Sequence, residues 1–117
     1  MKTIIIKEIP KSKHRYDTAG DYRKFRNGYL IEVSKDKNYI KTEDDLWGVV
    51  IHELVEMLLC LKRKINFKDI DKWDIEHLSD EREPGEIKGC PYYNEHKFAN
   101  KIENLFLKQL KKYGRVK

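Results

Sequence analysis

The stretch Trp47–Leu61, WGVVIHELVEMLLCL, is apolar almost from end to end, which is typical of a buried helix. His52, Glu53 and Glu56 nevertheless lie in its middle. Because a helix turns by about 100° per residue, His52 and Glu56 lie one turn apart on one face and Glu53 flanks that face. A carboxylate in such surroundings costs several kcal/mol unless it is paired or bound to a cation. We therefore expect the three side chains to share a cationic partner.

The spacing also resembles the HExxH helix of zinc peptidases, in which the first and fifth residues bind the metal and the second is the general base. The fifth position here is Glu56, which gives HExxE, and glutamate is a competent zinc ligand. The other interpretation is a buried His–Glu hydrogen bond with one exposed glutamate. We favour the metal site, because apolar residues cover nearly every angle of this helix and leave it little solvent-facing surface.

A metal site of this kind needs a further protein ligand from another part of the chain. We choose His96, at the start of an expected last helix, and Glu103 follows it seven residues later on the same edge. Glu103 can be a fourth ligand, or it can accept the second ring N–H of a ligating histidine. His77 is better explained as a core or capping histidine, and His14, in a charged loop, as a surface residue.

The sequence around this helix predicts two more helices. Thr42 and Asp45 form a capping-box pattern that starts the central helix, which we expect to run to about Lys64. A second helix is expected over about Phe67–Leu78 and a last one over about Asn94–Tyr113. The core stripe of the last helix is predicted to consist of Phe98, Ile102, Leu105, Phe106 and Leu110.

The first third of the chain is predicted to form strands. Lys2–Glu8 is rich in β-branched residues, and Asn27-Gly28 separates Tyr22–Phe25 from Tyr29–Val33, which is a strong hairpin signal. We therefore expect an α+β fold in one domain, 1–117. A small antiparallel sheet in about 1–40 would pack against one layer of three helices in about 42–113.

Length and composition restrict the class of protein. At 117 residues the chain has room for one modest core. No apolar run reaches the roughly 20 residues that span a bilayer, and the start MKTIIIKEIPK lacks the features of a signal peptide. Two cysteines form no disulfide framework, so we expect a cytoplasmic protein without a membrane segment. The net charge is +5, but acidic residues are interleaved among the basic ones, which favours a solvated surface over a nucleic-acid interface.

Several segments resemble, in the same order, a group of small phage and prophage proteins with a minimal zincin-like, metallopeptidase-type appearance. These segments are RYDTAGDY (15–22), YLIEVS (29–34), VIHELVEMLLC (50–60), EPGE (83–86), CPYYNEH (90–96) and FANKIE (98–103), and they cover most of the chain. The resemblance implies a compact zincin-like domain in which His52, Glu56 and His96 are the metal-site residues and Glu53 is the base. It also implies a role for Arg15, Asp17 and Asp21, for which an Arg–Asp clamp between the loop and the sheet is the plain explanation.

The function expected from these features is that of a small zinc-dependent hydrolase, most simply a metallopeptidase with one Zn²⁺ per chain and a peptide or protein substrate. Tyr92 or Tyr93 is the candidate for steadying the oxyanion. Two other classes stay open. One is a phage-type accessory binding protein with a structural or vestigial metal site. The less favoured one is a magnesium-dependent nucleotide pyrophosphohydrolase of the MazG type using Glu53, Glu56 and Asp74, which would not place His52 in its cluster.

Overall fold

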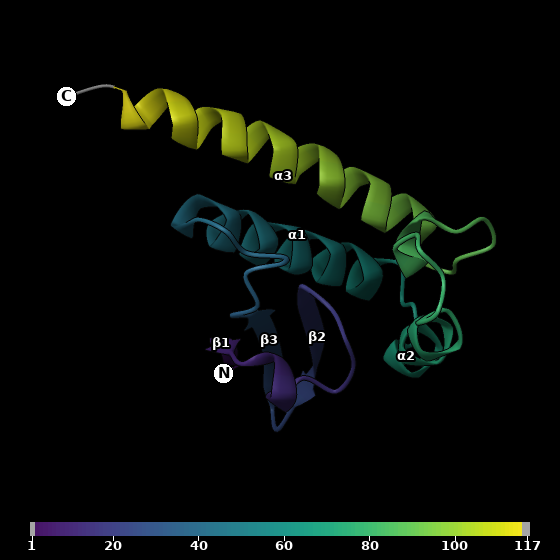
Figure 1. Ribbon diagram of the computed structural model, residues 1–117. Coiled ribbons are helices and arrows are strands. Elements are labelled where there is room, and N and C mark those ends of the chain that lie inside the picture. Colours follow the sequence, from purple (N-terminus) through teal and green to yellow (C-terminus); the bar gives the residue numbers. More distant parts are fainter. Residues whose placement is uncertain (1, 116–117) are drawn as a thin grey trace.

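The computed structural model describes residues 2–115 and confirms an α+β fold, with a three-stranded sheet at the N-terminal end and three α-helices after it (Figure 1). The strands are β1 (Ile4–Ile9), β2 (Gly20–Phe25) and β3 (Gly28–Ser34). The helices are α1 (Glu43–Lys62), α2 (Phe67–Glu76) and α3 (Tyr93–Gly114). Two short 3₁₀ turns, η1 (Lys11–Lys13) and η2 (Pro84–Glu86), lie in the connections.

The sheet has the strand order β1-β3-β2 and is mixed, not antiparallel as predicted. β2 and β3 form the expected antiparallel hairpin, but β1 pairs parallel to β3. The physical reason is the apolar character of β3, in which every residue except Tyr29 is buried and which therefore takes the central position. The hairpin turn also differs by one residue, because Phe25 pairs with Gly28 and leaves Arg26 and Asn27 in the loop.

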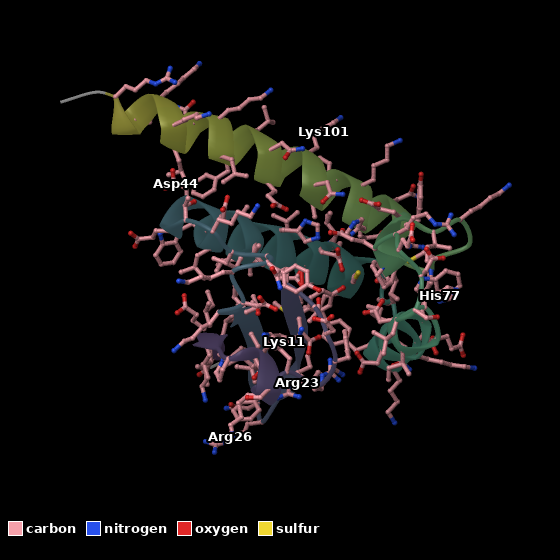
Figure 2. All side chains as sticks on the ribbon, viewed as in Figure 1. Lys11, Arg23, Arg26, Asp44, His77 and Lys101 are labelled. Carbon is pink, nitrogen blue, oxygen red and sulfur yellow. The ribbon has the colours of Figure 1, made fainter. Side chains whose placement is uncertain are left out.

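The predicted helix boundaries agree with the structure to within two residues. The capping box is present, since the Asp45 N–H donates to Thr42 Oγ1 and the Thr42 N–H donates to Asp45 Oδ2, both at 3.1 Å. His77 caps α2 as expected and lies at its end (Figure 2). Its Nδ1 lies 2.7 Å from the Trp73 carbonyl oxygen, and its ring stacks on that of Trp73. His14, expected at the surface, is instead half-buried, and neither of its ring nitrogens has a hydrogen-bond partner within residues 2–115.

Helix α1 lies between the sheet on one side and α3 on the other (Figure 1). The helices therefore form two layers over the sheet, where the sequence predicted one. Val50, Met57 and Cys60 of α1 belong to the hydrophobic core that also contains Ile31 and Val33 of β3. Being covered on both sides explains why α1 is apolar around nearly its whole circumference.

Helix α3 is rotated relative to the predicted core stripe. Phe98 and Leu105 are 46% and 57% exposed, whereas His96 and Ala99 are buried against α1. Its remaining stripe residues, Ile102, Phe106 and Leu110, are half-buried. The rotation places polar residues in the seam between the two helices.

The start of α3 is fixed to the end of α1 by Arg63. Its Nε and Nη2 donate to the two carboxylate oxygens of Glu95 at 2.7 and 2.8 Å, and Nη2 also donates to the Pro91 carbonyl oxygen at 2.7 Å. Glu95 is itself buried. Because His96 is the next residue, this contact determines where its side chain meets α1.

The segment before β2 is held by the expected Arg–Asp clamp. Arg15 donates to both carboxylate oxygens of the buried Asp21, at 2.9 and 2.8 Å, and also reaches Asp71 of α2 at 2.9 and 3.1 Å. Asp17, which the resemblance also singled out, accepts a hydrogen bond from the Tyr39 hydroxyl at 3.0 Å. The clamp thus joins the loop both to the sheet and to α2.

Both cysteines, Cys60 and Cys90, are free and buried. None of the helices formed by residues 2–115 combines the length and the apolar character that crossing a bilayer requires.

Candidate metal centre

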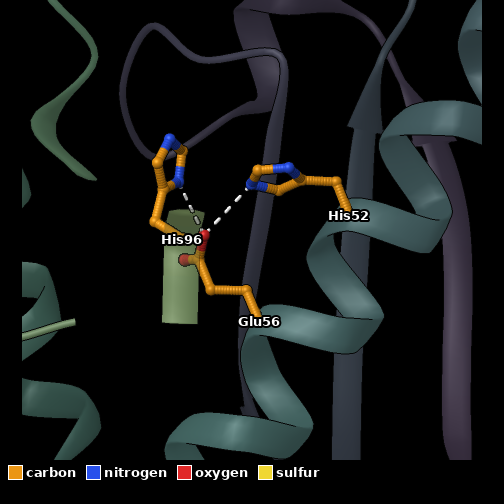
Figure 3. A group of neighbouring side chains, drawn as sticks. All are labelled: His52, Glu56 and His96. Carbon is orange, nitrogen blue, oxygen red and sulfur yellow. Dashed lines mark hydrogen bonds and ion pairs between the residues drawn. The ribbon is translucent and has the colours of Figure 1, made fainter. Parts of the chain in front are cut away.

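The three predicted ligands meet between α1 and α3, where His52 and Glu56 of α1 face His96 in the first turn of α3 (Figure 3). All three are buried, with exposures of 8%, 5% and 6%. His52 Nε2 and His96 Nδ1 point at one atom, Glu56 Oε2, at distances of 3.0 and 2.8 Å. Two imidazoles and a carboxylate thus offer ligand atoms that all lie within 4.8 Å of one another.

A second pair of carboxylates lies on the outer side of the two imidazoles. His52 Nδ1 is 3.0 Å from Glu103 Oε1, and His96 Nε2 is 3.1 Å from Glu83 Oε2. Neither outer nitrogen makes a hydrogen bond of acceptable geometry within residues 2–115, so these contacts are ion pairs. A carboxylate beside one ring nitrogen favours the proton on that nitrogen and leaves the lone pair on the other.

This arrangement fits a divalent cation. When each imidazole carries its proton on the outer nitrogen, the lone pairs of the two inner nitrogens face the Glu56 carboxylate oxygen. These electron-rich atoms repel one another unless a positive charge lies between them. Two histidines and one glutamate, with a further position open, are the donor set of catalytic zinc sites. The residues present therefore suit zinc in number, type and burial.

Protonation provides that positive charge in the metal-free protein. Burial lowers the pKa of His52, but Glu103 and Glu56 outweigh it and raise the pKa to about 11. For His96, burial is likewise outweighed by Glu56 and Glu83, and the pKa is raised to about 9. Burial raises the pKa of Glu56, yet the two imidazoles hold it below its usual value.

Two residues that sequence reasoning missed hold the centre in place. The Tyr22 hydroxyl of β2 donates to Glu56 Oε1 at 2.8 Å, which leaves Oε2 for the histidines. Glu83, just before η2, is the partner of His96 Nε2 described above. Strand alternation, which puts Tyr22 on the same face as its partner Ile31, is the signal that could have placed the tyrosine next to α1.

Glu53, the predicted base, is 8% exposed and has no hydrogen bond within residues 2–115. Its Oε2 lies 3.8 Å from His52 Nε2. Burial, followed by the charge of Glu56, raises the pKa of Glu53 well above its usual value. The backbone of Gly20 packs directly against this side chain, since a Cβ there would lie 2.7 Å from Glu53 Cγ. Glu53 is thus held in position by packing and by its ion pair with His52, with no hydrogen bond to its carboxyl group within residues 2–115.

A cleft of about 540 Å³ opens over the centre, lined by the 16–22 segment, α1, the 77–85 segment and α3. His52, Glu53, Glu56, His96 and Glu103 all line it. Tyr93 does not line it and is 41% exposed, so its role as an oxyanion donor stays a prediction. Tyr92 lines the cleft, but its hydroxyl donates to Asp74 and is not free.

Asp74 also lines the cleft, so the carboxylates of the magnesium alternative, Glu53, Glu56 and Asp74, do come to one place. The Asp74 carboxylate accepts hydrogen bonds from the hydroxyls of Tyr16 and Tyr92. Burial raises the pKa of Asp74 to about 7, although both tyrosines act in the opposite direction. Its carboxylate is therefore engaged by tyrosines and is not turned towards the histidines.

The buried Asp74 gives a prediction for stability. We compare the free energies of unfolding of the wild type and of Asp74→Asn. The wild-type value minus the variant value should fall as pH rises from about 4 to 7, by at most about 1.4 kcal/mol per pH unit. In that window the unfolded chain, with a pKa near 3.8, releases the proton that the folded protein keeps up to about 7. Urea unfolding at a series of pH values measures this difference. Asp69→Asn, on the exposed side of α2, is the control, and a difference independent of pH would contradict the assignment.

A second group, Glu83, Glu86 and His96, could also hold a metal ion. Both glutamates are exposed, and the group shares His96 with the buried centre. Because a neutral imidazole has one lone pair, His96 can serve only one of the two groups at a time. The buried group, with two imidazoles, is the stronger donor set for zinc.

No family model, curated protein or solved structure matches this chain. The function is therefore inferred from the geometry and chemistry of the site.

Proposed function

We propose that this protein is a zinc-dependent hydrolase, a small metallopeptidase of minimal zincin-like type that uses an HExxE helix. The observation that carries the proposal is the convergence of His52 Nε2 and His96 Nδ1 on Glu56 Oε2, with a carboxylate beside each outer ring nitrogen. The free, buried cysteines suit a reducing compartment, so we place the protein in the cytoplasm.

His52, Glu56 and His96 would hold one zinc ion per chain. When bound, zinc supplies Lewis acidity that activates water and polarises a carbonyl group. Glu53 accepts a proton from the attacking water and returns it to the leaving amine. Two features support this role: its carboxylate has no hydrogen bond of its own, and it lines the cleft beside His52. Positive charge at the centre favours its ionised form, because a nearby cation lowers the pKa of a carboxyl group.

Glu103 and Glu83 orient the imidazoles in this proposal. Glu103 meets His52 at Nδ1, the nitrogen that points away from Glu56, which supports an orienting role over that of a fourth ligand. A structural zinc site normally has four protein ligands. The open cleft and the outer position of Glu103 therefore favour a catalytic site over the structural site of an accessory binding protein.

The test is metal content followed by activity. Elemental analysis of untagged protein should find about one zinc per chain. Mass spectrometry of a peptide mixture should then show cleavage that stops with a chelator and returns with zinc. Protein that takes up no zinc on titration, or that binds magnesium in preference, would contradict the proposal and favour one of the two alternatives.

Gly85→Ala should weaken zinc binding by about 10- to 100-fold, the range seen when the support of a ligand is disturbed. A Cβ at this position of η2 would lie 2.4 Å from His96 Cγ, so the ring must move. Competition with a chromophoric chelator measures the affinity. Gly114→Ala is the matched control, because a Cβ there has no neighbour within 4 Å among residues 2–115. Equal zinc affinities of Gly85→Ala and the wild type would show that His96 is not a ligand in this position.

A further inference from the structure

Acidic residues far outnumber lysine and arginine in the lining of the cleft, although the chain as a whole is basic. The chain has 20 acidic and 25 Lys or Arg residues. Of the described residues that line the cleft, nine are acidic and one, Arg82, is Lys or Arg. Arg82 is paired with Asp80 at 2.9 Å. Arg15, which does not line the cleft, is paired with the lining residue Asp21 at 2.8 Å. Lys101 lies on the outer side of α3 and Arg26 at the far end of the sheet (Figure 2).

The metal centre accounts for only part of this charge. Asp17 and Glu81 line the mouth of the cleft from segments far apart in the sequence, and both are exposed. Neither belongs to either of the groups that could hold a metal ion. These two exposed carboxylates are therefore available to a cationic ligand other than the metal.

The mouth also carries exposed apolar surface. Tyr39 and Leu78 line it and are 41% and 47% exposed. The Tyr39 hydroxyl donates to Asp17, which fixes the ring beside that carboxylate. Burial raises the pKa of Tyr39, and the charges of Asp17 and, from the opposite segment, Glu83 contribute to the shift. The aromatic ring and the Asp17 carboxylate therefore lie side by side at the mouth.

An independent observation indicates that the cleft receives a ligand. Glu53 is more than nine-tenths buried, has no hydrogen bond within residues 2–115 and faces the cleft. Its one charged contact is the 3.8 Å ion pair with His52, so the carboxyl group can still accept a hydrogen bond from a ligand. The acidic mouth and this carboxyl group belong to the same cleft, so one ligand can meet both.

We propose that the mouth of the cleft binds the cationic side chain of a peptide substrate, lysine or arginine. The charged head lies between Asp17 and Glu81, and the aliphatic stem packs against Tyr39 and Leu78. Long basic side chains combine an apolar stem with a charged end, and a cation is attracted to an aromatic face. A cleft lined by one sign of charge also concentrates oppositely charged ligands. This inference rests on the proposed function and names its substrate class.

Binding and cleavage are measured on the same samples. Fluorescein-labelled heptapeptides that differ only in a central lysine, arginine, norleucine or glutamate are titrated with the wild-type protein as purified, at low salt. Fluorescence anisotropy reports binding, and mass spectrometry of each sample reports cleavage. Glu81→Gln should weaken binding of the lysine and arginine peptides about threefold, and Asp17→Asn with Glu81→Gln about tenfold, as expected for exposed ion pairs. Asp69→Asn with Glu76→Gln makes the same charge change on exposed positions of α2 outside the cleft.

The lysine and arginine peptides should bind about tenfold more tightly than the norleucine peptide. This preference should fall to about threefold in Glu81→Gln, disappear in the double cleft variant and persist in the α2 control. Equal binding of the lysine and norleucine peptides would overturn the inference, as would an equal loss in the α2 control. Cleavage without a basic preference overturns this inference and leaves the proposed function intact. A basic preference without cleavage supports the binding site and counts against the peptidase.

Discussion

His96→Ala is expected to lose its zinc, retaining less than about a tenth of the wild-type content after dialysis. Of the three converging residues, His96 is the one that comes from α3, and its Nδ1 lies 2.8 Å from the Glu56 oxygen that His52 also faces. Changes that only disturb the support of a ligand already weaken metal binding by about 10- to 100-fold, so removing a ligand should cost more. Elemental analysis of dialysed protein measures the loss.

The control for this experiment is His14→Ala, which removes an imidazole that does not line the cleft. Since deleting a buried ring can also disturb packing between α1 and α3, Glu56→Gln provides a second variant of nearly the same size. Circular dichroism should show both site variants folded, and both should lack zinc. Full zinc content in folded His96→Ala would remove His96 from the set of ligands.

The central features of the site were predictable from the sequence because they lie on one helix. Thr42 and Asp45 mark the start of α1, and a helix of known start has fixed angular positions for His52, Glu53 and Glu56. The apolar residues that surround them predicted burial, and all three are among the most buried residues of α1. Local pattern was sufficient here because no long-range contact was needed to define the geometry.

The remainder depended on contacts between distant segments. The spacing of apolar residues predicted that Phe98 and Leu105 lie in the core, but both are exposed. In the structure α3 turns a different face towards α1, the face that carries Glu95, paired with Arg63, and Glu103, paired with His52. Hydrophobic periodicity cannot predict a seam that contains polar residues, because it scores those residues as solvent-facing.

The sheet shows the same limit. Lys2–Glu8 is recognisable as a strand from its β-branched residues, but nothing local determines whether it pairs parallel or antiparallel to β3. The roles of Tyr22 and Glu83 were likewise hidden, since each is defined by its partner, Glu56 or His96, more than 10 positions away in the chain. The sequence therefore indicated which residues of α1 and α3 meet, but not how the segments around them assemble.

Glu53→Gln is expected to reduce hydrolysis by about 10²- to 10⁴-fold, the contribution of a general base, while zinc content stays near one per chain. Gln has nearly the shape of Glu but cannot accept the proton of the attacking water at neutral pH. The side chain does not belong to the group of converging ligands, His52, Glu56 and His96, so the metal should stay. Peptide cleavage and elemental analysis on one preparation separate the two effects, with Glu43→Gln in the exposed first turn of α1 as the control.

A catalytic role for Glu53 also makes a prediction about stability that a structural role would not. Burial raises the pKa of Glu53 in the metal-free protein, so the folded state loses stability as pH rises through that pKa and the carboxyl group must ionise. Glutamine has no such cost, and metal-free Glu53→Gln should therefore be at least as stable as the wild type above neutral pH. Thermal unfolding of both metal-free proteins checks this. If Glu53→Gln loses activity and becomes less stable, Glu53 supports the fold. If it loses activity but is as stable as the wild type or more so, Glu53 is retained for catalysis at a cost in stability.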